Sequence, residues 1–594
     1  MAIVKMSKIN VIGLLDDKEK VYTYLQNNAS VHIKMADDFD GTIYEKTDDK
    51  VEKLQSKKDT LDEIIDFIVD FTEQERVTPV TMQEIESVRE RRENLEKHKI
   101  LEKCSEIKNK VKELKTKLDL NGDLIVTLIK HREENLSTLV KNKVISPTII
   151  EKESDNMTAS EMIEKIKKDN ENIKSELAQI KEQLLHFEYL KDLKLESSLL
   201  SQDIEKAKCD GKIRKTESTF ILQFYLPKEE SAGILESLQK LSPTIVCEEM
   251  KIKREDNVPT LTKNDKLTKQ AEFVTNMYSV PSYHETDPNK LLFWFYMIFF
   301  GYIMADIGLG IALIVIGYGL AKKQIKESGS QKLWTLIGTG GIFSIFWGIL
   351  YNSMFGFKIL PFTIMPNPQN EAILTLLICL FMGVIHIACG YFMKGLNAIK
   401  NGSITDAIFD AFLWDTFFLG AIMALAKFLL NFFNLVDFTQ SGVLQSILSA
   451  IQLPGLIILL TSLLLIMIFA GRKSKGFGKL TKAFTSLYGI INLFSDILSY
   501  ARLFGLMLSG AIIGEQFDNI GISLMNSGAI GVVFGIVVII IGNAFNLAMG
   551  ALGAYIHDCR LQYIEYFGKF YTGEGELYTP FKPVYKYVTI KSDN

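Results

Sequence analysis

The sequence predicts a mostly α-helical protein in which a charged arm precedes a helical membrane domain. From Met1 to about Asn289 charged residues are dense, and no apolar run approaches the ~18 residues of a membrane span. From Lys290 to about Tyr571, by contrast, long apolar runs are separated by short polar loops. We therefore expect residues 1–289 to form a cytoplasmic arm and residues 290–594 to form a transmembrane domain with a short cytoplasmic C-terminal tail.

Composition excludes several classes of function. The 594 residues include 67 basic and 71 acidic side chains, a net charge of −4, which gives no electrostatic case for binding nucleic acid. The six cysteines show no CxxC spacing, so neither a disulfide framework nor a metal site is indicated, and no cofactor is expected. The start has no basic leader before an apolar core, so we expect a multi-pass cell-membrane protein whose N-terminal half stays in the cytoplasm.

The arm begins and ends with strand-like segments. Residues 3–14 and the segment from Val31 read as strands of a small proximal α/β lobe. From Lys215 a strand, a proline and a helix follow one another, which predicts a second, distal α/β lobe. The arm contains no GxxxxGK[ST] loop, so we expect no nucleotide hydrolysis of the P-loop type.

Two lysine- and glutamate-rich stretches between these segments predict a helical rod. Apolar residues recur in both at spacings of three and four, as paired helices require, and an antiparallel coiled coil is expected. Neither run sustains four clean heptads, so an ordinary helical bundle remains an alternative. The two seams are Leu101, Cys104, Ile107, Val111, Leu114 and Leu118, and Ile166, Ile173, Leu177, Ile180, Leu184 and Phe187.

The membrane half predicts about eight spans. Lysine-rich loops from Ala321, Lys394 and Gly471 are expected to face the cytoplasm, so residues 290–321 must cross an even number of times, with a turn near Asp306. A count of seven, which would place the C-terminal tail outside, is the alternative. Further spans are expected near 333–356, 371–396, 405–430, 450–470, 483–515 and 527–568. The last two exceed a bilayer's thickness, so they must tilt, break or extend into the cytoplasm.

A single cation, Arg502, lies in the apolar run after Tyr500. An arginine at membrane depth costs roughly 2.5 to 3.5 kcal/mol, so chains carry one there mainly when it faces a pathway or a partner. Arg502 is therefore a candidate functional residue. The alternative is that it pairs with a nearby carboxylate such as Asp496, or reaches a lipid headgroup.

The membrane half resembles a known family along its whole length. MYSVPSYHETDP (277–288), FFGYIMADIGLG (299–310), GILYNSMFG, GVIHIACG, SYARLFGLMLS and RLQYIEYFGKFYTGEGELYTPF are similar to the stator membrane subunit of V/A-type rotary ATPases, called subunit a or subunit I. The resemblance is to prokaryotic members. The signature at membrane entry comprises Tyr283, Asp287, Pro288, Gly301, Asp306, Gly308 and Gly310.

The resemblance implies a function. Such a subunit is not an enzyme by itself; it forms two half-channels for H⁺ or Na⁺ against a rotating ring of c- or K-type proteolipids in an ATP-driven or ATP-synthesising complex. The arm would bind peripheral-stalk subunits of the E and G types and a central-stalk subunit of the d or C type. Arg502 and Arg560 match the family's two translocation arginines, and Glu565 matches a carboxylate that follows the second. A fixed guanidinium favours the ionised ring carboxylate and so expels its ion.

Polar residues inside the last two spans are candidates for lining the half-channels. They can equally bridge helices, and Arg560 can form a structural pair with flanking acids. The candidates are Ser495, Asp496, Ser499, Ser509, Glu515, Asp518, Asn543, Asn546, His557, Asp558 and Glu565. His386 is interpreted as a packing or hydrogen-bonding residue. Eukaryotic members carry a histidine and a glutamate at the positions of Gly510 and Gly550, so their proton paths do not transfer directly.

Two other functions are weighed against this one. A membrane-tethered coiled-coil scaffold would use the buried charges only to hold helices together. A stand-alone secondary transporter is disfavoured, because the hydropathy pattern shows no two-fold repeat.

Overall fold

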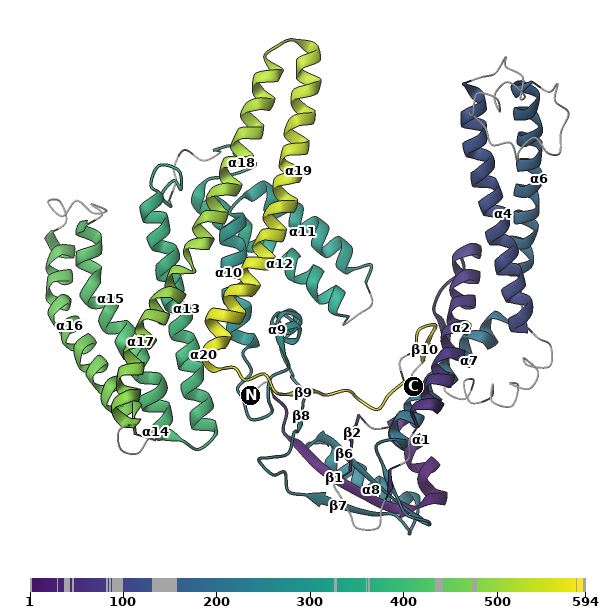
Figure 1. The fold of residues 1–594 in the computed structure, drawn as a ribbon, viewed down its shortest axis with the longest axis horizontal. Helices are drawn as coiled ribbons and strands as arrows, with labels where there is room; N and C mark the ends of the chain where they lie inside the picture. Colours follow the sequence, from purple (N-terminus) through teal and green to yellow (C-terminus); the bar gives the residue numbers. More distant parts are fainter. Residues whose placement is uncertain are drawn as a thin grey trace. The chain divides into compact units, whose positions relative to one another are not determined.

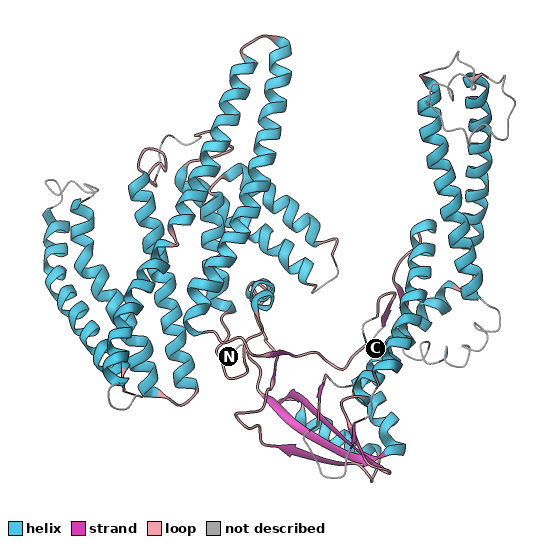
Figure 2. Ribbon diagram, viewed as in Figure 1, coloured by secondary structure: helices cyan, strands magenta, loops and turns pink. Residues whose placement is uncertain are grey.

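A computed structural model describes most of the chain (Figures 1 and 2). The described residues leave out 1–2, 29, 37–42, 45–46, 82–83, 85–86, 88–99, 131–157, 188, 325–327, 359–360, 362–363, 433–441, 473–477, 584 and 591–594. The chain divides into two compact units. Met1–Met6 and Ile252–Tyr578 form the membrane unit, and Ser7–Lys251 and Thr579–Asn594 form the arm unit.

One six-stranded sheet lies in the arm unit, and both ends of the arm sequence contribute to it. Its order is β3-β5-β6-β1-β7, with β2 paired to β6, and α1 (Lys18–Asn28) and α8 (Ser231–Leu241) complete the lobe. The strands are β1 (Met6–Leu14), β2 (His32–Lys34), β3 (Ile43–Tyr44), β5 (Arg214–Lys215), β6 (Thr219–Pro227) and β7 (Val246–Met250). Val11 lies opposite Cys247 in antiparallel register.

This sheet corrects the prediction of two α/β lobes. The segments expected in a proximal and a distal lobe pair with each other, so the strands from Lys215 onward complete the first lobe. The physical reason is burial: β1 and β6 are buried along most of their length and each needs a neighbour on both edges. Residues 131–157, between the two rod helices in sequence, lie outside the described residues.

The rod consists of α4 (Ile100–Ile129) and α6 (Ala159–Leu185), which pack antiparallel. Cys104, Val111 and Leu114 of the predicted seam are buried in it, whereas Leu101 is 43% exposed and Ile100 takes its place. A capping box at Thr158 and Glu161 starts α6. At the base of the rod α2 (Asp48–Thr72) packs on α7 (Leu190–Asp210).

The C-terminal tail folds onto the arm unit. Thr579 and Phe581 bond to His32 and Val31. Tyr587 is fully buried against α2, where its hydroxyl donates to the carbonyl oxygen of Asp62 at 3.0 Å. Strand β10 (Val588–Ile590) then pairs in parallel with β4 (Thr78–Val80).

The membrane unit is helical. Six described helices are long and apolar enough to cross a membrane: Gly329–Tyr351, Ala372–Lys400, Ile404–Phe428, Ser446–Ala470, Phe484–Met525 and Ala529–Phe570. Two shorter apolar helices, α10 (Asn289–Met304) and α11 (Ile307–Ala321), precede them. Helix α9 (Glu272–Tyr278) and the short strands β8 (Pro259–Thr260) and β9 (Glu576–Leu577) lie at the entry.

The other helices follow one another with short connections. They are α12 (Gly329–Tyr351), α13 (Ala372–Lys400), α14 (Ile404–Ala407), α15 (Leu413–Phe432), α16 (Gly442–Ala470), α17 (Gly478–Leu498), α18 (Ala501–Met525), α19 (Ala529–Arg560) and α20 (Gly568–Phe570). A π-helical segment, Leu561–Phe567, connects α19 to α20. We call it the π segment.

The predicted turn at Asp306 is confirmed. Helix α10 ends at Met304, Ala305 has a positive φ of 22°, and the Asp306 side chain accepts the backbone N–H of Leu309 to start α11. The same carboxylate accepts the N–H groups of Phe355 and Gly356, at 3.0 and 3.3 Å. Asp306 therefore fixes both the helix break and the loop after α12.

The two overlong spans are both interrupted, which is one of the three outcomes that their length allowed. The first breaks at Ser499–Tyr500, between α17 and α18. The second carries the π segment directly after Arg560. Beyond these interruptions α18 and α19 pack side by side as a long hairpin (Figure 1).

The arm unit also constrains the number of crossings. The chain leaves that unit at Lys251 and returns to it at Thr579, and every described helix that qualifies as a span lies between these residues. A folded unit lies on one side of a bilayer, so the intervening chain crosses an even number of times. The seven-span alternative would place the tail on the other side of the membrane from strand β4, with which it pairs.

Candidate functional site

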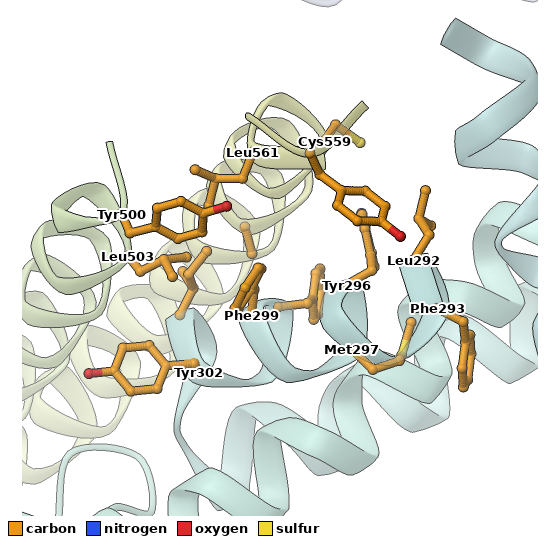
Figure 3. Packing of buried hydrophobic residues seen from close by; sticks show 14 of the residues in the cluster. Leu292, Phe293, Tyr296, Met297, Phe299, Tyr302, Tyr500, Leu503, Cys559 and Leu561 are labelled. Atoms are coloured by element: carbon orange, nitrogen blue, oxygen red, sulfur yellow. The ribbon is translucent and has the colours of Figure 1, made fainter. Parts of the chain in front are cut away.

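Helix α10 is the centre of the membrane unit's core. Figure 3 shows its side chains Tyr296 and Phe299 pointing toward residues of the two long C-terminal helices, including Leu503 and Leu561. Tyr296, Phe299, Leu503 and Leu561 are each at most 1% exposed. The core thus holds the starts of α18 and of the π segment, where the two arginines lie, against one rigid element.

Arg502 lies in the first turn of α18. Its Nη1 atom is buried and makes no hydrogen bond, and no ion pair to an acid within 4 Å is formed by it among the described residues. It interacts electrostatically with Arg560 and with Glu565. The nearest acid in sequence, Asp496, is paired with Lys569 instead. The sequence left open that Arg502 pairs with Asp496, but in the structure Asp496 pairs with Lys569.

Arg560 is the last residue of α19 and its side chain is exposed. Within the described part of the chain it too forms no ion pair, although His557, Asp558 and Glu565 flank it in sequence. Arg502 and Arg560 are close enough to repel each other electrostatically. Two neighbouring guanidinium groups, neither in an ion pair with a described acid, create a positive site, and such a site attracts an external carboxylate.

Asp496, Ser499 and Glu565 lie on one side of Arg502. Glu565 is 2% exposed, belongs to the π segment and interacts with Ser499, Arg502 and Asp496. Asp496 is half-buried in its ion pair with Lys569 of α20. The structure therefore brings these three predicted residues together at the α17–α18 break.

A cavity of about 660 Å³ lies on the other side, along α18 and α19. His557 is at one end and interacts electrostatically with both arginines. Glu515, 13 residues after Arg502 and so roughly 20 Å along the helix, lies near the other end. There Gln369, from the loop between α12 and α13, donates to Glu515 at 2.6 Å. Ser509, Gly510, Asn546 and Gly550 also line the cavity.

Three predicted lining residues make contacts between or within helices. Asn543 donates to Asp518 at 3.0 Å, and Asn546 donates to the carbonyl oxygen of Gly510 at 3.1 Å, so both tie α19 to α18. Asp558 is fully buried and accepts from Gln562 one turn later. Asn543 and Asp558 do not line the cavity, whereas Asn546 both bridges the helices and faces it.

The signature residues at membrane entry hold the backbone in place. The Tyr283 hydroxyl accepts from the N–H of Met6, and Asp287, before Pro288, accepts from Asn289 at the start of α10. Three glycines allow close approach: a Cβ atom at Gly301, Gly308 or Gly310 would lie 2.6, 2.3 or 2.8 Å from Phe343, Phe355 or Gly341.

Two partners of the site could not be found by sequence reasoning. Lys569 pairs with Asp496, 73 residues earlier, and Gln369 pairs with Glu515, 146 residues later. Both are single polar residues in segments without a distinctive pattern. Their only signal is a charge or amide beside an apolar span, which many loop residues share.

Known proteins resemble the chain over most of its length. Residues 96–366 match the V-type ATPase 116kDa subunit family. The A-type ATP synthase subunit I of Pyrococcus horikoshii is 30% identical over 71% of the chain, and the match spans 62% of that relative's length. The subunit I of Methanocaldococcus jannaschii is 26% identical over 81% of the chain and 75% of the relative. The V-type ATP synthase subunit I of Chlamydia trachomatis is 25% identical over 59% of the chain and 60% of the relative.

Proposed function

We infer that the chain belongs to the V-type ATPase 116kDa subunit family, and we propose that it is the stator membrane subunit of a rotary V/A-type ATPase or ATP synthase. It is a multi-pass membrane protein. In the proposal it catalyses no reaction itself, and the membrane unit carries H⁺ or Na⁺ past a proteolipid ring. The arm unit lies in the cytoplasm and binds E- and G-type peripheral-stalk subunits and a d- or C-type central-stalk subunit.

One observation supports the proposal: polar residues gather both before Arg502, at the α17–α18 break, and after it, along the cavity beside α18 and α19. The cavity extends from His557 to Glu515 on one side, and Asp496, Ser499 and Glu565 lie on the other. Two aqueous paths that do not meet are what a rotary ion motor needs, and a permanent cation between them stops an ion-loaded ring site from slipping past.

Each region then has a task. The cavity forms the outer half-channel, since its far end is lined by the loop between α12 and α13. Glu565 and Ser499 line the inner half-channel, beside the Asp496–Lys569 pair. A carboxylate of the ring loses its ion as it approaches Arg502 and Arg560, because the guanidinium groups favour its ionised form.

The test is Arg502→Ala in the assembled complex, reconstituted into vesicles. We expect ATP-driven ion uptake to fall to background, with the subunits present in normal ratio. Arg502→Lys should also fail to restore normal coupling, because lysine can lose its proton when desolvated. Arg472→Ala is the matched control: this arginine pairs with Asp406 and Asp410, and its loss should leave the number of ions moved per ATP unchanged.

Retained coupled transport in Arg502→Ala would reject the proposal in favour of the scaffold alternative. A scaffold also predicts that Arg502→Gln combined with Glu565→Gln is tolerated, because only helix packing would need to be conserved. Uptake measured separately with a pH indicator and with a Na⁺ indicator identifies the ion.

A further inference from the structure

Tyr500 occupies the break between α17 and α18, two residues before Arg502. It is fully buried, and its hydroxyl lies 2.7 Å from Nδ1 of His386 on α13, which is also fully buried. Gly383, one turn before His386, makes room for the tyrosine: a Cβ atom there would lie 2.4 Å from the Tyr500 ring. Helix α13 therefore positions Tyr500 in two ways: Gly383 leaves room for its ring, and His386 forms a hydrogen bond with its hydroxyl.

The other side of His386 faces the π segment. The Tyr566 ring stacks on the imidazole, with centroids 4.6 Å apart and planes at 19°. Gln562 also interacts with His386, and its Nε2 donates to Asp558 at 3.2 Å. All of these side chains are fully buried. One imidazole thus contacts both interruptions, the one before Arg502 and the one after Arg560.

These contacts fix backbone positions. The carbonyl oxygens of Ser499 and Tyr500 accept the N–H groups of Arg502 and Leu503, so the first turn of α18 starts from the tyrosine. The π segment carries Glu565, whose carboxylate interacts with Arg502. Interruptions of this kind leave backbone groups without their usual helical partners, and they persist only where surrounding contacts determine them.

We propose that His386 is a positioning residue for ion translocation, which ties the break at Tyr500 to the π segment and so sets the placement of Arg502 relative to Glu565. This inference rests on the proposed function. In it His386 neither touches the ion nor passes a proton. It acts through Tyr500 and Tyr566.

The first test measures ions transported per ATP hydrolysed in vesicles that contain the assembled complex. Tyr500→Phe keeps the ring and removes the hydroxyl, and we expect the ratio to fall about fivefold with the complex intact. Combining Tyr500→Phe with His386→Phe should lower the ratio no further than the more harmful of the two single changes. Both changes remove the same hydrogen bond, the one between Tyr500 and His386. His386→Gln, whose amide can bond Tyr500, should recover most of the ratio.

Tyr302→Phe is the matched control. Tyr302 is also fully buried in this core, and its hydroxyl bonds Tyr351 and Cys379 rather than the interruptions. Its loss should lower stability without changing the ratio. An unchanged ratio in Tyr500→Phe, or an equal fall in Tyr302→Phe, would overturn the inference.

A second readout needs no transport. Cysteines introduced as Ser499→Cys and Glu565→Cys report the distance between the break and the π segment through their cross-linking yield. We expect Tyr500→Phe to lower this yield several-fold and Tyr302→Phe to leave it unchanged; an unaffected yield in Tyr500→Phe contradicts the inference. Because the yield does not depend on ion flux, failure of the proposed function, seen as transport by Arg502→Ala, is distinguishable from failure of this inference.

Discussion

At the scale of single residues, Arg502, the charge whose cost the sequence predicts, forms no ion pair within 4 Å with any acid that the structure describes, although it interacts with Glu565 at longer range. The cost of Arg502 in an apolar run could be predicted, because it depends only on burial and charge. Its environment could not. Asp496 was the obvious partner by sequence distance, yet Lys569, which approaches through the turn at α20, forms the ion pair with it. Helix packing decides which charges pair in space, and the six-residue separation of Asp496 and Arg502 in the sequence does not predict it.

Gly510 and Gly550 differ from the eukaryotic pattern, and both line the cavity. Among the described atoms, only Asn546 Oδ1 lies within 4 Å of a Cβ atom built at Gly510, at 3.8 Å, so larger side chains there would extend into the open space. We expect transport to fall progressively through Gly510→Ala, Gly510→Val and Gly510→Leu, by at least tenfold at leucine, because the cavity is the proposed path. ATP-driven uptake by reconstituted complex measures this.

Gly319→Leu is the control for that series. Gly319 is exposed on α11 and lies outside the cavity, and a Cβ atom there would meet no described atom within 4 Å. The variant should transport normally. Equal effects at positions 319 and 510, or full transport in Gly510→Leu, would argue against an ion path through the cavity.

At the scale of elements, length predicted the interruptions and packing placed them. Helices of 33 and 42 residues exceed a bilayer's thickness, so the spans had to tilt, break or extend into the cytoplasm. Neither the break at Ser499–Tyr500 nor the π segment contains a proline, the usual local cause of a helix interruption. A glycine directly follows only the π segment, at Gly568. Their cause is tertiary, the buried contacts of Tyr500 and Tyr566 with α13, and no local pattern encodes that.

The break at Asp306 is different, because an acidic residue between glycines in an apolar run is a local signal. Its carboxylate accepts four hydrogen bonds, from the N–H groups of Leu309, Phe355 and Gly356 and from the hydroxyl of Ser353. Asp306→Ala leaves these donors unsatisfied, and we expect a loss of about 3 kcal/mol or more in stability. The thermal midpoint of the purified chain in detergent measures it.

Asp415 of α15 supplies the contrast for that measurement. Both of its carboxylate oxygens are buried and accept no hydrogen bond from the described residues. Removing an unpaired buried carboxyl relieves a desolvation cost, so Asp415→Ala should leave the midpoint unchanged or raise it. Equal losses at positions 306 and 415 would mean that burial, not hydrogen bonding, decides the role of these acids.

At the scale of the whole molecule, the sequence separated a charged half from an apolar half but could not pair strands across the rod. Residues 3–14 and the segment from Lys215 are each predicted as strands from their alternating apolar residues. Alternation indicates which face of a strand is buried, but it does not indicate which other strand lies beside it. The pairing of Val11 with Cys247 therefore appeared only in the fold. The sequence of the C-terminal tail likewise gave no indication that it packs on the arm unit, although Tyr587 is a core residue of that unit.

That tail makes the topology of the chain testable. Since Thr579–Ile590 packs on the arm unit, an even number of crossings separates Lys251 from Thr579, and the six long and two short apolar helices give eight if each crosses. Eight spans place Asn401, in the turn after α13, on the same side as the C-terminus, and Asn370, in the loop before α13, on the opposite side. Impermeant labelling of Asn401→Cys, Asn370→Cys and a C-terminal tag in intact cells checks this.

We expect Asn370→Cys alone to be labelled from outside, and Asn401→Cys and the tag to react only after the membrane is opened. Both asparagines are exposed, so burial in the protein would not explain a missing signal. A tag accessible from outside would contradict the packing of the tail on a cytoplasmic arm. Labelling of Asn401→Cys from outside would instead mean that α10 and α11 together cross the bilayer an odd number of times, and the mouth of the cavity would then face the cytoplasm.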